Sequence, residues 1–172
     1  MLRVFCFGTL GITVEDLYLI DPDPELGGHE RGVRVELRLL DPRPWRGSGT
    51  ASQPIIVDRA VWRADFLESV AGGPGSKDRM HHHPAMADNE PGRRVFDTDL
   101  TADPMGWLQD QLDDVAPLLA EAGVDPGAHR PSAAAVSEAS PDLVGTVATV
   151  LNAVREGVLA TAPKKTADTG RA

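Results

Sequence analysis

Residues 33–40 constrain the fold more than any other part of the chain, because apolar and charged side chains alternate along them without interruption. Alternate side chains of a β-strand point to opposite faces of the sheet. The alternation therefore predicts a strand that buries one face and leaves the other in water. The apolar positions are Val33, Val35, Leu37 and Leu39, and the charged positions are Arg34, Glu36 and Arg38.

Two further stretches have the composition of strands. Residues 2–20 are rich in β-branched and aromatic side chains and are interrupted by Gly8 and Gly11, which predicts two strands joined by a turn. Residues 55–70 are also strand-like but exceed the usual length of a strand. We therefore expect either a bend near residues 58–59 or two strands in succession.

The segment that follows the long strand predicts a hairpin. Residues 71–76 read AGGPGS, a composition typical of turns, and they join the long strand to the segment DRMHHHP at 78–84. After a polar stretch that contains proline and glycine, a short strand is expected to return at 94–97.

The hydrophobic period changes in the second half of the chain. An Asp–Pro start signal followed by apolar residues at helical spacing predicts a helix over 104–122. Pro117 lies inside this helix, so we expect the helix to kink or to be rebuilt there. A Ser–Pro pair at 140–141 repeats the start signal and predicts a second, amphipathic helix over 140–160.

These elements predict an α+β fold, in which an antiparallel sheet of about four to six strands within residues 2–97 is covered by one or two C-terminal helices. The expected organisation is a single α+β domain over 1–123 and a flexible connector over 124–139, which is rich in small residues and proline. The amphipathic helix follows the connector, and the polar residues 161–172 are expected to form a disordered tail.

Composition limits the classes of protein to consider. The 172 residues fit one ordinary domain, and the net charge of −9 argues against nonspecific coating of nucleic acid. No run of about 18 apolar residues is present, so the sequence predicts a soluble protein without a membrane span. The single cysteine, Cys6, cannot form an internal disulfide, which agrees with a cytoplasmic location.

The most unusual local feature is a run of three consecutive histidines. In a strand, His81 and His83 share one face, while the histidine between them points to the other. Arg63 and Asp65 are likewise two residues apart, and Arg79 has the same parity as His81 and His83. A suitable register between the two strands of the hairpin would place these side chains in one pocket, although the sequence does not fix that register.

Two kinds of chemistry fit such a pocket. In the first, Asp65, His81 and His83 ligate a divalent first-row metal, zinc or iron, with positions left open for water or substrate. Arg63 and Arg79 then hold an anionic substrate. In the second, no metal is present, His81 acts as general acid or base, and the two arginines stabilise negative charge. Hydrolysis is the reaction class that we expect from either arrangement.

Parts of this segment resemble known motifs. The spacing of Gly75, His81 and His83 resembles the opening of the first cupin motif. The carboxylate that follows is Asp88 rather than a glutamate at the motif's spacing, and no second histidine motif follows, so we do not assign the chain to the cupins. The sequence RAD at 63–65 with the histidines is similar to segments of small toxin ribonucleases, which adds phosphodiesters to the substrates to consider.

A noncatalytic hypothesis stands beside these. The histidine run lies next to Pro84 in a turn-rich region, where it would equally suit a solvated loop. The apolar stripe of residues 143–158 would then dock onto a partner protein or a second copy of the chain. In that case the chain is an interaction module rather than an enzyme.

Overall fold

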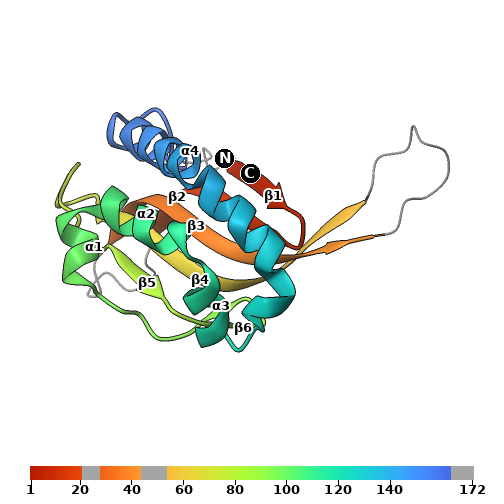
Figure 1. Ribbon diagram of the computed structural model, residues 1–172. Helices are drawn as coiled ribbons and strands as arrows, with labels where there is room; N and C mark the ends of the chain where they lie inside the picture. Colours follow the sequence, from red (N-terminus) through yellow and green to blue (C-terminus); the bar gives the residue numbers. More distant parts are fainter. Residues whose placement is uncertain (21–27, 44–53, 164–172) are drawn as a thin grey trace, which may run out of the picture.

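The computed structural model describes residues 1–20, 28–43 and 54–163, and these form an α+β fold. Five antiparallel strands make one sheet in the order β1-β2-β3-β4-β5, with each strand beside the next along the chain (Figure 1). This confirms the fold class and the number of strands expected from the sequence. The strands are β1 (Leu2–Phe7), β2 (Leu10–Ile20), β3 (His29–Pro42), β4 (Ile55–Ser69) and β5 (His81–His83).

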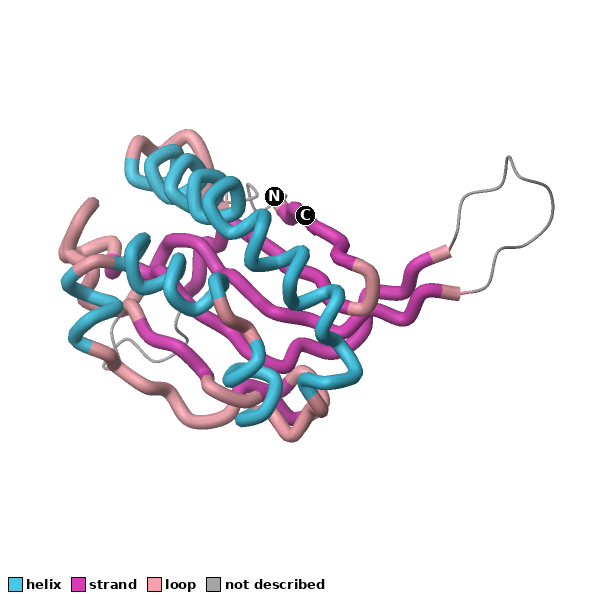
Figure 2. Tube along the Cα trace, viewed as in Figure 1, coloured by secondary structure: helices cyan, strands magenta, loops and turns pink. Residues whose placement is uncertain are grey.

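The helices lie over one face of this sheet, as the cyan segments in Figure 2 show. A small second sheet follows β5 and pairs β6 with β7. The remaining elements are β6 (Met86–Ala87), β7 (Glu90–Pro91), α1 (Thr98–Ala102), α2 (Pro104–Asp113), α3 (Ala116–Glu121), the 3-10 helix η1 (Pro126–His129) and α4 (Arg130–Arg155).

The core forms between the helices and the apolar face of the sheet. The alternation predicted over 33–40 is present, since Val35 lies opposite Val14 on one side and Ala64 on the other, and all three are fully buried. Trp107 of α2 stacks on Trp62 of β4, with ring centroids 6.0 Å apart. The sheet therefore has one face sealed by helices, and its other face carries the charged residues.

The expected bend in the long strand is present as an irregularity in the pairing of β3 with β4. Val57 pairs with Leu40 and Ala60 pairs with Arg38, so residues 58–59 have no regular partners. A bulge of this kind bends and twists a strand. Beyond it, the ends of β3 and β4 extend as a two-stranded ribbon past the part of the sheet that the helices cover (Figure 1).

The helix expected over 104–122 is rebuilt near Pro117, as the sequence indicated. It is divided into α2 and α3, and Pro117 lies in the first turn of α3, where its missing N–H costs no helical hydrogen bond. The Asp114 carboxylate accepts a hydrogen bond of 3.0 Å from the Ala116 N–H at this junction. The break therefore keeps the apolar stripe of both pieces on the sheet.

The expected flexible connector over 124–139 was wrong in most of its length. Residues 126–129 form η1, and α4 begins at Arg130, ten residues before the predicted start. The small residues at 133–135 are alanines, which have the highest helix propensity, and Pro131 occupies the first turn, where proline is tolerated. The small-residue run is thus helix-forming sequence rather than a linker.

Pro141, interpreted from the sequence as a helix start, lies inside α4. Proline cannot donate to the carbonyl four residues earlier, which here is Ser137. The hydroxyl of Ser140 lies 2.8 Å from that carbonyl and can donate to it instead. The same single proton can also go to the Asp113 carboxylate, so this contact compensates only in part, and burial of Val136 and Leu143 on either side of Pro141 holds the helix together.

Helix α4 ends at Arg155 rather than at residue 160, and residues 164–172 of the expected tail lie outside the described residues. The Arg155 guanidinium binds the buried Glu68 carboxylate of β4, with Nη2 and Oε1 2.6 Å apart. The apolar stripe of α4 faces the core. Its buried members are Leu143, Val147, Val150, Leu151 and Val154.

Among the described helices, none is both long enough and apolar enough to cross a bilayer.

Gly32 provides a test of how closely β3 and β4 approach. A Cβ atom at this position would lie 2.0 Å from the Phe66 carbonyl oxygen, so backbone would have to move. We expect Gly32→Ala to destabilise the fold by about 3 kcal/mol, lowering the melting temperature by roughly 6–12 °C. Gly145→Ala is the control, because its Cβ meets nothing within 4 Å on α4, and it should be neutral or stabilising. Equal melting temperatures for the two variants would contradict the predicted contact.

Candidate metal centre

The charged face of the sheet is organised in two rows that run across the strands. In one row, Arg34 of β3 lies opposite Asp65 of β4, which lies opposite His81 of β5. In the neighbouring row, Arg63 of β4 lies opposite His83 of β5 and, on its other side, opposite a glutamate of β3. Antiparallel register thus places the two histidines directly beside the carboxylate and arginine predicted to accompany them.

The short strand β5 is fixed on both sides. On one side it pairs with β4, and on the other His82 exchanges two backbone hydrogen bonds with Val95, of 3.0 and 2.9 Å. The connection from β4 is held by Asp78, whose carboxylate accepts hydrogen bonds from the Ser69 N–H, at 2.9 Å, and from the hydroxyls of Ser69 and Ser76. Burial opposes ionisation there, but these bonds outweigh it and lower the pKa of Asp78 to about 2.

Asp65, His81 and His83 bring three potential metal ligands together in the interior. The Asp65 Oδ2 atom lies 3.4 Å from Nε2 of His81 and 3.7 Å from Nε2 of His83, and each of the three residues is at most 4% exposed. Two ligands of one tetrahedral zinc ion, each at about 2.1 Å from it, are about 3.4 Å apart. Within the described ranges, these three residues form the one cluster of this kind that could hold a metal ion.

The tautomer of each histidine follows from its other ring nitrogen. Nδ1 of His81 lies 2.8 Å from the Arg79 carbonyl oxygen, and Nδ1 of His83 lies 3.0 Å from the Gly92 carbonyl oxygen. A carbonyl oxygen only accepts hydrogen bonds, so Nδ1 carries the proton in both rings. The Nε2 atoms are those near Asp65, and each offers a lone pair whenever its ring is neutral. Metal-ligating histidines have this arrangement, with the second nitrogen donating to a carbonyl or carboxylate.

The Asp65 carboxylate is held in its ionised form by His83 and Arg34. The Arg34 guanidinium donates from Nε to Oδ1 at 2.7 Å and from Nη2 to Oδ2 at 3.4 Å. Burial alone would raise the pKa of Asp65, but the interactions with His83 and Arg34 outweigh it and lower the pKa to about 2. The site therefore holds a permanent negative charge at neutral pH.

His81 is kept neutral in the same site. Burial lowers the pKa of His81, and the charges of His83 and Arg94 lower it further, whereas the Arg79 carbonyl and the Asp65 charge act in the opposite direction. The net shift is downward. A neutral imidazole is the form that ligates metals, so this environment favours metal ligation by His81 over the protonated form of its ring.

A cavity of about 280 Å³ opens over these side chains. Three arginines and two carboxylates line it, together with apolar side chains from β2 and β4, so its lining carries a net positive charge. All three candidate ligands line this space, so a metal held by them would lie beside it. The lining residues are Leu19, Glu30, Arg34, Arg63, Asp65, Leu67, His81, His83, Pro91, Gly92 and Arg94.

The predicted residues differ in how they take part. Arg63 lines the cavity, but its guanidinium binds Glu36, with Nε and Oε1 2.8 Å apart. Arg79 is not among the lining residues; its side chain pairs with Glu30 at 3.5 Å, and its carbonyl orients His81. Of the five predicted residues, four line the cavity, namely Arg63, Asp65, His81 and His83, and the side chain of Arg79 lies outside it.

Sequence reasoning missed two cationic residues of the site, Arg34 and Arg94. Both were detectable in principle. Arg34 stands on the charged face of the alternating strand 33–40, and Arg94 begins the short return strand predicted at 94–97. Neither could be placed near Asp65 without knowing which strands are neighbours, because alternation fixes the face of a residue but not its partner.

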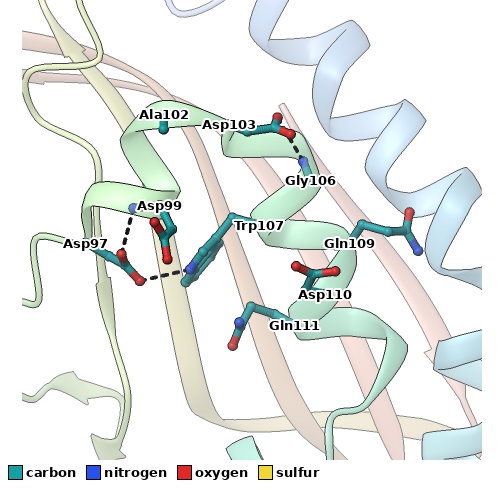
Figure 3. A pocket seen from close by; sticks show the side chains of 9 residues that line it. All are labelled: Asp97, Asp99, Ala102, Asp103, Gly106, Trp107, Gln109, Asp110 and Gln111. Atoms are coloured by element: carbon teal, nitrogen blue, oxygen red, sulfur yellow. Dashed lines mark hydrogen bonds between the residues drawn. The ribbon is translucent and has the colours of Figure 1, made fainter.

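A larger and more open hollow of about 610 Å³ lies between α1 and α2, with four aspartates in its lining (Figure 3). Several of these carboxylates have local structural partners. Asp97 accepts hydrogen bonds from the Asp99 N–H and from the Trp107 indole N–H, and Asp103 caps α2 by accepting from the Gly106 N–H. Helix capping thus accounts for two of the four aspartates, Asp97 and Asp103.

Comparisons of the chain with protein-family models, with curated proteins and with solved structures gave no match. Inferences about function accordingly rest on the chemistry of the site itself.

The Arg34–Asp65 pair predicts a specific dependence of stability on pH. Because the folded pKa of Asp65, about 2, lies below its ordinary 3.8, ionised Asp65 stabilises the fold above about pH 4 and this contribution is lost as pH falls toward 2. Arg34→Gln should cost about 2 kcal/mol at neutral pH, and less in acid. Urea unfolding at about pH 7 and pH 3 measures both values.

Arg31→Gln is the matched control, since it removes a cation from the same strand at a position of opposite parity. The loss of unfolding free energy caused by Arg31→Gln should be small and the same at both pH values. A cost for Arg34→Gln that is equal at both pH values would show that the guanidinium does not hold the Asp65 charge.

Proposed function

We propose that this protein binds one divalent first-row transition metal ion, zinc or iron, through Asp65, His81 and His83. The observation that carries the proposal is the convergence of two imidazole Nε2 atoms and one ionised carboxylate oxygen in a buried site. The Nε2 atoms lie 3.4 and 3.7 Å from the carboxylate oxygen, and all three ligand atoms lie within 4.8 Å of one another. Neutral imidazoles held in this way offer their lone pairs, together with the carboxylate, to one cation.

The set of donors supports zinc or iron over magnesium or calcium. Imidazole nitrogens favour first-row transition metals, whereas magnesium and calcium prefer oxygen donors alone. Three protein ligands leave at least one position open, which is the arrangement of catalytic rather than structural metal sites. When bound there, such a metal lowers the pKa of a coordinated water and polarises a substrate oxygen.

We therefore infer a metal-dependent enzyme that acts on a small anionic substrate, with hydrolysis as the reaction class that requires no further cofactor. The net positive lining of the cavity supports the choice of an anion. In this proposal His81 acts as a ligand, and Arg63 adds positive charge to the wall of the cavity.

The two alternatives have less support. In the metal-free mechanism, Arg63 and Arg79 bind the anion, yet their guanidinium groups already pair with Glu36 and Glu30. In the noncatalytic alternative, the stripe of residues 143–158 docks onto a partner. Most of that stripe is buried in the core, and Val158, 68% exposed, follows the end of the helix.

Thermal unfolding with and without zinc tests the metal site. At a free zinc concentration 100-fold above the dissociation constant, binding should stabilise the fold by about 2.7 kcal/mol, which raises the melting temperature by roughly 5–10 °C for a chain of this size. The double variant His81→Ala/His83→Ala should show no such rise. Isothermal titration calorimetry on the same samples gives the stoichiometry, with one ion expected per chain.

His29→Ala is the matched control because His29 lies outside the site and its ring contacts Tyr18. Its response to zinc should equal that of the unmodified protein. Zinc stabilisation that persists in the double variant, or that is absent from the unmodified protein, would overturn the proposed site.

A further inference from the structure

Arg94 reaches the metal cavity from the segment that borders β5. Val95 pairs with His82, so its two neighbours lie on the opposite side, the side of His81 and His83. The ring of Phe96 accordingly lies 5.5 Å from that of His81, and Arg94 lines the cavity. The bridge to β5 thus adds one cation to the rim of the site.

Arg94 differs from the other two arginines of the cavity in having no internal partner. Arg34 binds Asp65, and Arg63 binds Glu36, in each case through a close ion pair. Within the described residues Arg94 makes no hydrogen bond and no ion pair, and its side chain is exposed. Its guanidinium is therefore available to an external anion, whereas the other two are already neutralised.

We propose that Arg94 binds the oxyanion group of a small ligand, a carboxylate or a phosphate, whose second oxygen occupies an open coordination position of the metal. This inference rests on the proposed metal site and adds to it the chemical class of the ligand and the residue that selects it. Arg94 is thereby a binding residue at the mouth of the cavity.

The shape and chemistry of the cavity fit such a ligand. A guanidinium presents a planar fork of donors that matches two oxygens of a carboxylate or phosphate. The volume of about 280 Å³ lies at the lower end of ligand pockets, which restricts the occupant to a small molecule. Leu19 and Leu67 give one wall an apolar surface that suits a short hydrocarbon chain attached to the oxyanion.

The test uses the full chain loaded with cobalt(II), whose visible absorption reports its ligands. Cobalt is titrated first, and then acetate and inorganic phosphate are titrated separately into the loaded protein. We expect Arg94→Ala to bind cobalt like the unmodified protein but to bind the preferred anion about tenfold to hundredfold more weakly. The anion that binds more tightly identifies the class of ligand.

Arg93→Ala is the matched control. It removes the same charge from the adjacent position, but its parity places it on the other side of the segment, where its charge acts on His82 rather than on His81. Its anion affinity should match that of the unmodified protein.

The outcomes separate the two proposals. If cobalt does not bind to the unmodified protein, the metal site itself is wrong, and this inference fails with it. If cobalt binds, but neither anion changes its spectrum, or Arg94→Ala and Arg93→Ala weaken the anion equally, then the metal site stands and the role of Arg94 is refuted.

Discussion

The carboxylate of Asp65 is buried between one guanidinium and two imidazoles, and the charged face of the sheet is arranged around it. Moving an ionised carboxylate out of water costs several kcal/mol unless partners compensate for the lost hydration. Arg34 provides that compensation through two hydrogen bonds. His83 contributes further, because its interaction with the carboxylate also lowers the pKa of Asp65. When both rings are neutral, their Nε2 atoms offer lone pairs to a cation beside the carboxylate.

The two faces of the sheet have different roles in this arrangement. One face packs against helices, and the other carries the charged residues of the site. Helices α2, α3 and α4 seal the apolar face, and Trp107 of α2 stacks on Trp62 of the sheet. His82 points toward this side and lies against Trp107, whereas its two neighbours point to the charged face. The middle residue of this three-residue strand thus lies in the core, and the outer two are the candidate metal ligands.

Rigid elements position every donor atom. Asp65 lies in the longest strand, β4, between β3 and β5, and β5 is paired on both sides, so neither of the two strands has a free edge at the site. The backbone carbonyls of Arg79 and Gly92 fix the ring orientations. Sites built on strands are more exact in geometry than sites on loops, which suits a metal centre whose ligands must lie within tenths of an ångström.

The sequence predicted that Asp65, His81 and His83 could share a face because parity links residues two apart, and both Asp65 with Arg63 and His81 with His83 meet that condition. It could not place Arg94, since its position depends on the bridge from Val95 to His82, which joins segments through tertiary structure. The start of α4 was misplaced for a different reason. Pro141 has the signature of a helix start, but the helix passes through it because residues on both sides of Pro141 are buried in the core.

X-ray absorption spectroscopy of the stoichiometric zinc complex measures the central claim most directly, because it reports the number, type and distance of the ligands. The structure predicts nitrogen and oxygen ligands at about 2.0–2.2 Å, with the outer-shell scattering of two imidazole rings. That imidazole scattering should disappear in the His81→Ala/His83→Ala variant. A spectrum with a sulfur ligand at about 2.3 Å, or one with no imidazole contribution, would contradict a metal centre at Asp65, His81 and His83.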